Sequence, residues 1–436
     1  MNKSRVYFYF ILSFFVSLSV KSVYCINNIG CRIRITNDTN EKFVPVLLKN
    51  SSVGFNLVIT ENSIINLEKG DYLTFYCPKK NYLRITNTSL EHGRCLTGNI
   101  LNIKGNTFNF SNILCKNQVE GELQRTEDTC GHKNGRLFNI GYQVTPEDFV
   151  TLIKICYDEY LALPLYAVHT IFGKEIEYAT KFANRTKFST EGIPRDVAAE
   201  VIYRGGRRDQ KVKISNLLGG TKFGECYINN QSSYLARGHL APDQDFLFAS
   251  GQLSTYFYIN TLTLAPSEFY NFWVARNMLE AKDAVNRQSI NGGNWVRLEA
   301  AIRRNAANYQ HNFTIITGTH EVMELPNANT ELTKIFLAPK NRLPVPKFIW
   351  KIVVDVETKN GIAFVNINNP FLTKMSENDI LCKNICKDYD WDYQYFNTSI
   401  YKGLIYCCDI NELRYVVNTI PYITVRGVLK RKKNKI

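Results

Sequence analysis

The sequence predicts two folded units, a small β-rich domain followed by a larger α+β domain. Its 436 residues exceed the roughly 100–200 residues of one ordinary domain. A composition of 45% apolar and 21% charged residues is typical of globular proteins and argues against disorder, collagen or a multi-span membrane protein. Short β-branched and aromatic runs fill the first third, whereas strand-like and helix-like segments alternate beyond about residue 137.

The first residues predict a secretory signal peptide at 1–25. Lys3 and Arg5 precede an apolar run from Val6 to Val20, and small residues follow before Cys25. This run is shorter than the about 20 residues that span a bilayer, and no later stretch is long and apolar enough to anchor the chain. We therefore expect cleavage near 22–25 and a secreted, extracellular protein without membrane contact.

The cysteines and the glycosylation acceptors agree with export. Twelve cysteines in an oxidising compartment predict disulfide bonds rather than free thiols or a zinc cluster, and the sequence leaves their pairing open. A glycoprotein is expected because eight Asn-x-Ser/Thr acceptors are spread along the chain, at Asn37, Asn50, Asn87, Asn109, Asn184, Asn230, Asn312 and Asn397.

Residues 26–120 predict the β-rich domain. The runs at 55–60 and 71–76 have strand composition and end at turn residues. This part has no cluster of His, Asp and Glu at catalytic spacing, so it is interpreted as an accessory or binding module stapled by disulfides. The polar stretch 121–136 is predicted to be a linker.

Residues 137–425 predict the α+β domain. Thr145 and Pro146 are typical of a helix start, and apolar residues follow at helical spacing up to Cys156. Strands are predicted at Leu163–Ile171, Phe313–Thr317 and Phe348–Val354. The basic residues of 426–436 predict a solvated tail with weak phosphate contacts at most.

Two segments carry the chemistry. In the first, Arg237 and His239 flank a glycine within Tyr234–Asp243; a lone histidine is more often structural than catalytic. In the second, Asn291-Gly-Gly leads into a helix predicted over Trp295–Arg303, with Glu299 and Arg303 on one face. Alone, this segment is more typical of an ordinary capped helix with an exposed ion pair than of a catalytic site.

These residue types suit phosphodiester hydrolysis. A histidine with an ordinary pKa near 6.5 is partly neutral at pH 7 and can take a proton from water. Arginine offers planar donors that match phosphate oxygens. Such a site contacts the sugar-phosphate backbone, so it predicts RNA and DNA as partners with little sequence specificity. A surplus of 53 Lys and Arg over 39 Asp and Glu, a net charge of +14, favours polyanions.

Together the two segments resemble the DNA/RNA non-specific endonuclease family of ββα-metal nucleases, especially the secreted insect nucleases that degrade double-stranded RNA. Arg237-Gly-His239-Leu-Ala-Pro is similar to the catalytic motif, and Tyr258-Ile-Asn260 to a strand with a supporting Asn. Asn291 and Glu299, eight positions apart, match the metal-ligand helix. The resemblance spans about 137–409 and implies a ββα-metal nuclease domain with a mixed or antiparallel central sheet.

The resemblance also implies roles. His239 would be the general base, Asn291 the protein ligand of Mg²⁺, with Mn²⁺ as an alternative, and Glu299 would hold water beside the metal. Asn260 would support the histidine site. The resemblance further implies cuts that leave 5′-phosphates, and phosphate contacts from three arginines, Arg237, Arg303 and Arg185. Arg185 would also be catalytic, as the arginine that the family directs at the transition state.

Two departures from the family leave other functions open. Ala236 stands where the familiar motif has Asp, and about 262–283 looks inserted between Asn260 and Asn291. If the insertion displaces Asn291 from His239, the chain would be a catalytically impaired extracellular protein that binds nucleic acid or another polyanion. A glycan- or matrix-binding protein led by the β-rich domain is a third interpretation. The sequence leaves the oligomeric state open.

Overall fold

The computed structural model describes residues 30–35, 41–180, 186–204, 207–221, 227–228, 235–264, 291–369, 372, 375–396 and 402–432. The predicted signal peptide and the predicted insertion beyond residue 264 lie outside these residues. Residues 262–264, which the sequence assigned to the insertion, belong to strand β14 (Thr261–Leu264).

The first domain is β-rich, as predicted. Its main sheet has six antiparallel strands in the order β3-β2-β5-β6-β7-β8, and β1 pairs with β4 beside it. Disulfides Cys31–Cys95 and Cys77–Cys115 staple this domain. The strands are β1 (Cys31–Arg34), β2 (Val46–Ser51), β3 (Gly54–Leu57), β4 (Ile64–Leu67), β5 (Tyr72–Tyr76), β6 (Leu90–Thr97), β7 (Ile100–Ile103) and β8 (Asn106–Asn109).

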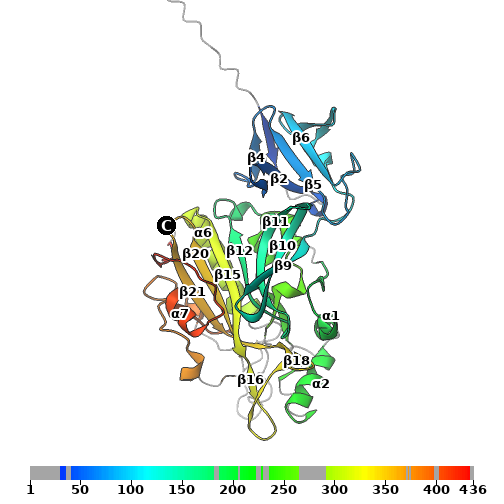
Figure 1. The fold of residues 1–436 in the computed structure, drawn as a ribbon. Coiled ribbons are helices and arrows are strands. Elements are labelled where there is room, and N and C mark those ends of the chain that lie inside the picture. The colour runs from blue at the N-terminus through cyan, green and yellow to red at the C-terminus, as the bar shows by residue number, and fades with distance from the viewer. Residues whose placement is uncertain are drawn as a thin grey trace, which may run out of the picture.

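A nine-stranded central sheet forms the second domain (Figure 1). Its order is β22-β21-β20-β15-β12-β11-β10-β9, and every pair is antiparallel except β21 with the short β23, so the predicted mixed sheet is confirmed. The strands are β9 (Glu122–Cys130), β10 (His132–Thr145), β11 (Asp148–Asp158), β12 (Leu163–Ile171), β15 (Phe313–Val322), β20 (Pro346–Asp355), β21 (Asn360–Ile367), β22 (Ile405–Cys408) and β23 (Gly427–Val428).

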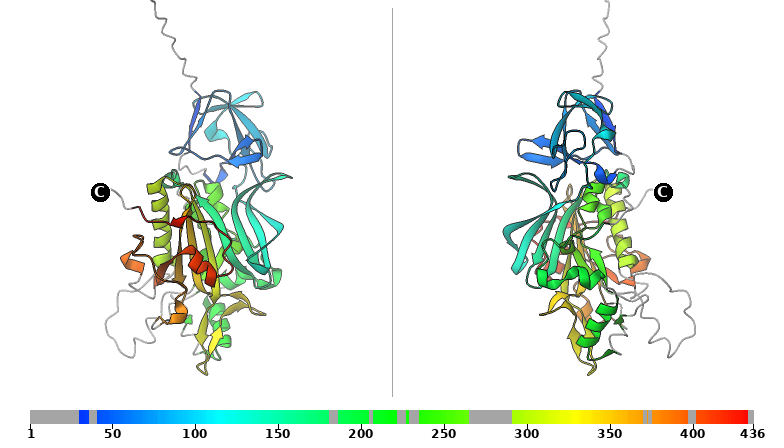
Figure 2. Two further views of the ribbon diagram at one scale, coloured as in Figure 1. Left: turned by 60° about the vertical axis from the view of Figure 1, so that its left-hand side comes forward. Right: turned by 90° about the vertical axis from the view of Figure 1, so that its right-hand side faces the viewer.

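Alternation along the central strands makes a core on each face of this sheet. In β20, Ile349 and Val353 join the core with α6 (Val296–Tyr309), the longest helix among the described residues, while Trp350 and Ile352 join the core with α7 (Ile410–Val416). Figure 2 shows α6 running along the sheet. The core on the α6 face also includes residues of α1 (Ala199–Arg204), α2 (Arg207–Leu217) and the pairs β13–β14, β16–β17 and β18–β19. The short helix α4 (Ala249–Leu253) lies between β13 and β14 in the chain. The bounds of the remaining strands are β13 (Ala236–His239), β16 (Glu324–Pro326), β17 (Leu332–Lys334), β18 (Phe336–Ala338) and β19 (Arg342–Pro344).

The predicted helix after Thr145 is wrong, because residues 148–158 form strand β11. Thr145 pairs with Asp148, so Pro146 begins a tight turn rather than a helix. The buried side chains of Ile153 and Ile155 flank the exposed Lys154, and β-branched residues favour a pleated surface.

The predicted linker at 121–136 is also wrong, because β9 and the start of β10 occupy most of it. The stretch is polar because β9 is an edge strand that pairs only with β10 and exposes many side chains to solvent. The disulfide Cys130–Cys156 fastens it to β11.

The two domains share one core at their junction. Tyr142, Val144 and Val150 from β10 and β11 pack into the core of the β-rich domain. The buried Glu175 carboxylate accepts hydrogen bonds from the Thr60 hydroxyl at 2.9 Å and from a backbone amide of the same loop, Asn62, at 3.2 Å. The accessory domain is thus docked on the sheet rather than tethered by a linker (Figure 1).

The expected basic tail is anchored up to residue 432. β23 pairs with β21, the Lys432 amide donates to Asn305 Oδ1 at 2.8 Å, and the Tyr309 hydroxyl donates to the Lys430 carbonyl at 3.0 Å. Cys382–Cys408 and Cys386–Cys407 fasten the neighbouring segment. Among the described residues, no helix combines the length and apolar character needed to cross a membrane.

Candidate active site

The β13–β14 pair presents Arg237 and His239 side by side. Both are half-buried and lie two positions apart, hence on one face of β13, while Ala236 and Gly238 face the core. A Cβ at Gly238 would collide with the Leu264 side chain, so glycine is needed for the close approach of the two strands.

Aromatic rings surround these two side chains. The His239 ring lies 5.1 Å from the Phe188 ring and 5.0 Å from the Tyr256 ring, the latter edge-on. The Arg237 guanidinium lies 4.5 Å over the Phe188 ring, and its Nη1 donates to the Tyr258 hydroxyl at 3.2 Å. Stacking and hydrogen bonding therefore fix the orientation of Arg237 before any substrate binds.

Asn260 holds the backbone that follows His239. Its fully buried side chain accepts from the Ala241 amide and donates to the Ala241 and Thr255 carbonyls, all at 3.0 Å. The Leu240 amide donates to the Asn260 carbonyl at 2.9 Å. These contacts make Asn260 a support of the histidine segment rather than a group that faces a substrate.

Helix α6 brings a buried carboxyl group to the same region. Burial raises the pKa of Glu299 to about 7; the charge of Lys351 acts against this, and those of Asp245 and Asp243 add to it. The Lys351 ammonium, buried in β20, lies 3.7 Å from Glu299 Oε1 and donates to Thr317 Oγ1 at 2.8 Å. Burial lowers the pKa of Lys351, and Glu299 partly restores it.

Arg303 ties α6 to the segment after His239. It donates to Asp245 Oδ1 at 2.7 Å and to Gln244 Oε1 at 3.0 Å, and the buried His169 lies 2.8 Å from Asp245 Oδ2. Burial opposes ionisation of Asp245, but the His169 hydrogen bond and the Arg303 charge outweigh it and lower its pKa to about 2. The two sequence motifs therefore meet through this ion pair.

The structure brings together His239, Arg237, Asn260, Glu299 and Arg303. Arg185 lies outside the described residues. The backbone of Asn291 belongs to the π-helical turn Asn291–Trp295 before α6, and its side chain lies outside the described part.

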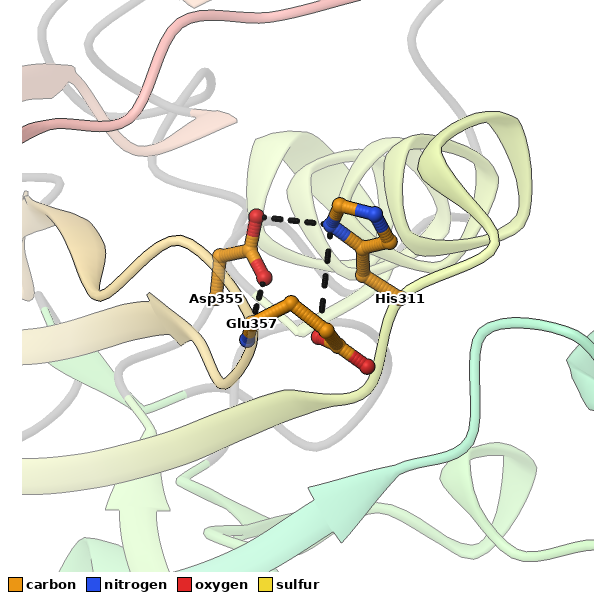
Figure 3. Close-up of side chains that lie close together, drawn as sticks. All are labelled: His311, Asp355 and Glu357. Carbon is orange, nitrogen blue, oxygen red and sulfur yellow. Dashed lines mark hydrogen bonds and ion pairs between the residues drawn. The ribbon is translucent and has the colours of Figure 1, made fainter.

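Another group of possible metal ligands lies beyond the far end of α6 (Figure 3). His311 Nδ1 lies 2.9 Å from Asp355 Oδ2, and Glu357 Oε2 lies 3.9 Å from His311. The Asp355 oxygens also accept from the Glu357 amide and from the Thr358 amide and hydroxyl. These bonds occupy the buried carboxylate, so the group is better explained as a cap of the β20–β21 turn than as a metal site.

Comparison with known proteins identifies the fold around this site. The family model described as DNA/RNA non-specific endonuclease matches residues 133–267 and 284–413, more than half of the chain. The chain belongs to the DNA/RNA non-specific endonuclease family. The predicted family and fold are thereby confirmed, and the protein is a nuclease. The match omits 268–283, which lies within the predicted insertion.

Insect salivary proteins are similar to this endonuclease over most of its length. "Salivary endonuclease" of Lutzomyia longipalpis is 28% identical over 89% of this chain and 83% of its own. "Salivary protein Tsal2A" of Glossina morsitans morsitans is 25% identical over 92% of this chain and 94% of its own. A solved structure of an EndoG/EndoGI complex aligns with a TM-score of 0.28 and 14% identity over 51% of this chain and 74% of that chain, an overlap too small to add to the fold assignment.

Several residues around the site were not predicted from the sequence. Phe188 and Asp245 have no local signal, because their contacts come from distant segments. Lys351 did have a local sequence signal, because it is a single charge inside the apolar run 348–354. Such a charge in a central strand needs a buried partner. His169 is buried in β12, and its partner Asp245 also binds Arg303.

Proposed function

We propose that this endonuclease is a secreted, Mg²⁺-dependent, sugar-non-specific enzyme that hydrolyses phosphodiester bonds of RNA, including double-stranded RNA, and DNA, leaving 5′-phosphates. The observation that carries the proposal is the pairing of His239 with Arg237 on one strand, joined through the Asp245–Arg303 ion pair to the helix that bears Glu299. Five disulfides among the described residues and the salivary relatives support secretion.

His239 would act as the general base. The Phe188 and Tyr256 rings fix the plane of its imidazole, and Tyr256 is itself held by a hydrogen bond to Asp243 Oδ2 at 2.9 Å. A neutral imidazole in this position can take a proton from the attacking water. Arg237, already oriented, would bind a phosphate oxygen and stabilise the charge that develops on it.

The charges around Glu299 fit a divalent cation. Burial together with the negative charges of Asp245 and Asp243 disfavours ionisation of Glu299, and a cation at this end of α6 would relieve that cost. Mg²⁺ prefers oxygen ligands, which Asn291 and water oriented by Glu299 would provide. When bound, Mg²⁺ would supply a fixed positive charge beside the phosphate and the leaving oxygen.

Arg303 and Arg185 remain predicted phosphate contacts. The hydrogen bonds from Arg303 to Asp245 and Gln244 favour a structural role for Arg303 in the site. A substrate phosphate would have to compete with Asp245 for the same guanidinium group. Arg185 adds a testable position outside the described residues.

The deciding experiment incubates the purified secreted protein with plasmid DNA and with long double-stranded RNA, in Mg²⁺ or in EDTA, and labels the product ends. We expect cleavage of both substrates in Mg²⁺ alone, with 5′-phosphate ends that polynucleotide kinase labels only after phosphatase treatment. Tight binding without cleavage by folded protein would refute the enzyme and favour the catalytically impaired binding protein.

A further inference from the structure

The outer face of α6 carries a surface that the proposed chemistry does not use. Arg297 and Arg304 are exposed on this helix, and Arg431 and Lys432 of the C-terminal segment lie along it with the rings of Tyr393 and Tyr395. We call these six residues the α6 basic strip.

The three arginines gather around one tyrosine. The Arg297 guanidinium lies 5.2 Å over the Tyr395 ring, and the Arg431 guanidinium lies 4.5 Å over the Tyr393 ring, which stacks on Tyr395 at 5.1 Å. Burial and the neighbouring Tyr393 raise the pKa of Tyr395 to about 12, and the charges of Arg304, Arg297 and Arg431 oppose that rise. The positive charges of all three arginines therefore act on the same hydroxyl.

Within the part of the chain that the structure describes, no ion pair joins any of these three arginines to a carboxylate. The acidic residues of the adjoining loop do not change this. Asp390 pairs with Lys430 at 3.2 Å, and Asp388 and Asp392 are exposed without an ion pair to the strip. Neighbouring like charges repel each other, so this cluster of arginines destabilises the folded protein, and a bound anionic ligand would offset the repulsion.

The strip is held rigidly in place. Trp391 is buried, and its Nε1 donates to the Leu429 carbonyl at 2.9 Å. The Arg431 amide donates to the Tyr389 carbonyl at 3.0 Å, and Lys432 Nζ donates to the Asn308 carbonyl at 2.7 Å. Because loop, C-terminal segment and helix are bonded to each other, a ligand would meet an already ordered surface.

The position and the chemistry favour a nucleic acid. Arg297 belongs to the first turn of α6, directly after the Asn291–Trp295 turn, and Arg304 lies about 10 Å further along the axis, about three base-pair steps of B-DNA. Arginines stacked on aromatic rings keep their planar donors directed at phosphate oxygens. The strip thus begins at the predicted metal end of the helix and extends away from it.

We propose that the α6 basic strip binds the sugar-phosphate backbone of the nucleic acid beyond the bond that is cut. This inference rests on the proposed function only in taking nucleic acid as the substrate. It extends the substrate footprint from the Arg237–His239 strand to the outer face of α6 and the C-terminal segment.

The test measures binding of a fluorescent 40-base-pair duplex in EDTA over a range of salt concentrations. We expect the triple variant R297Q/R304Q/R431Q to lower the slope of log K against log salt by about 2 to 3, since each lost phosphate contact removes about 0.9. The charge-preserving variant R297K/R304K/R431K should keep the wild-type slope.

The matched control removes three exposed arginines of the accessory domain, R32Q/R34Q/R94Q, which costs the same net charge. We expect this control to change the slope by less than 1. An equal change in both triple variants, or an unchanged slope in the α6 variant, would overturn the inference. Loss of heparin binding with nucleic acid binding intact would assign the strip to sulfated glycans and overturn it too.

Two further comparisons make the outcome decisive. Because Arg431 packs on Tyr393, its substitution can destabilise the protein, so thermal unfolding is measured for each variant to check that it is folded. If the triple variant does not fold, the double variant R297Q/R304Q should lower the slope of log K against log salt by about 2. Cleavage in Mg²⁺ is measured separately. If the wild-type protein binds through the strip but does not cleave, the proposed function is refuted and the strip is not. If the wild-type protein cleaves but the α6 triple variant keeps the wild-type slope of log K against log salt, the strip is refuted and the proposed function is not.

Discussion

At the scale of single residues, aromatic packing explains how two neighbouring side chains of β13 become a site. Arg237 is held between the Phe188 ring and the Tyr258 hydroxyl, and the same Phe188 ring contacts His239. The Arg-Gly-His motif was visible in the sequence. The rings that orient it were not, because Phe188 reaches β13 only through tertiary packing.

Arg237→Lys should lower kcat/KM by about 100-fold, because lysine keeps the charge but loses the planar stacking and the fixed donors. Steady-state cleavage of a short labelled duplex measures the effect. Tyr258→Phe removes only the hydroxyl that accepts from Arg237 and should cost less than about tenfold. Equal activity of Arg237→Lys and wild type would show that Arg237 does not contact the reacting phosphate.

Glu299 gives stability a pH dependence of known sign. Its pKa of about 7 in the folded protein lies above the ordinary value of 4.5, so the folded protein binds the extra proton and loses stability as pH rises from about 4.5 to 7. Glu299→Gln abolishes this dependence. The variant should therefore gain about 3 kcal/mol relative to wild type between pH 4.5 and pH 8.

Urea unfolding in EDTA at several pH values measures this gain. Loss of the Lys351 partner also changes the absolute stability, so the slope of the difference against pH, rather than its size at one pH, tests the idea. A difference between variant and wild type that stays constant from pH 4.5 to pH 8 would show that Glu299 has an ordinary pKa in the folded protein.

At the scale of elements, the sequence predicted strands correctly where the apolar runs are long. It failed where a turn or the edge of a sheet determines the secondary structure. The runs at 163–171, 313–317 and 348–354 lie within β12, β15 and β20. Pro146 was taken for a helix start, although pairing of Thr145 with Asp148 makes it a turn residue. Likewise, the charged sequence of β9 resembled a linker. Its strand conformation depends on backbone hydrogen bonds to β10, which the local composition does not reveal.

Asn260 is the residue that fixes the β13–β14 element around the histidine. Asn260→Ala leaves three buried backbone groups without their partner, at about 1–3 kcal/mol each, so we expect a loss of about 3 kcal/mol or more and a strong loss of cleavage. Chemical unfolding and cleavage assays measure both. Asn418→Ala, an exposed control, should change stability by less than about 0.5 kcal/mol. Similar effects of the two variants would refute this role.

At the scale of the whole molecule, the accessory domain and the nuclease domain share a core, which neither composition nor periodicity could reveal. The contacts run from loop 60–63 to Glu175 and from β10 and β11 into the β-rich sheet. A truncation at the predicted boundary near Leu137 would therefore cut through β10 and remove β9, and would not yield an intact nuclease domain.

We expect the two domains to unfold in one cooperative transition. Glu175→Ala removes the acceptor of Thr60, Asn62 and Ser63 and should lower the unfolding temperature by several degrees, since hydrogen bonds to a buried charge contribute about 1.5–3 kcal/mol each. Differential scanning calorimetry measures this, with the exposed Glu177→Ala as the matched control. Two separate transitions in the wild-type protein would contradict the shared core.

The proposed hydrolysis depends most on His239 as the general base in an intact site. The direct measurement is the single-turnover cleavage rate of saturating enzyme on duplex RNA in Mg²⁺, for wild type and for His239→Ala of equal thermal stability and equal affinity in EDTA. We predict a rate about 1,000-fold lower in the variant, the middle of the roughly 100- to 10,000-fold range that general acid–base catalysis contributes. A rate within tenfold of wild type would contradict the account and move the chemistry away from β13.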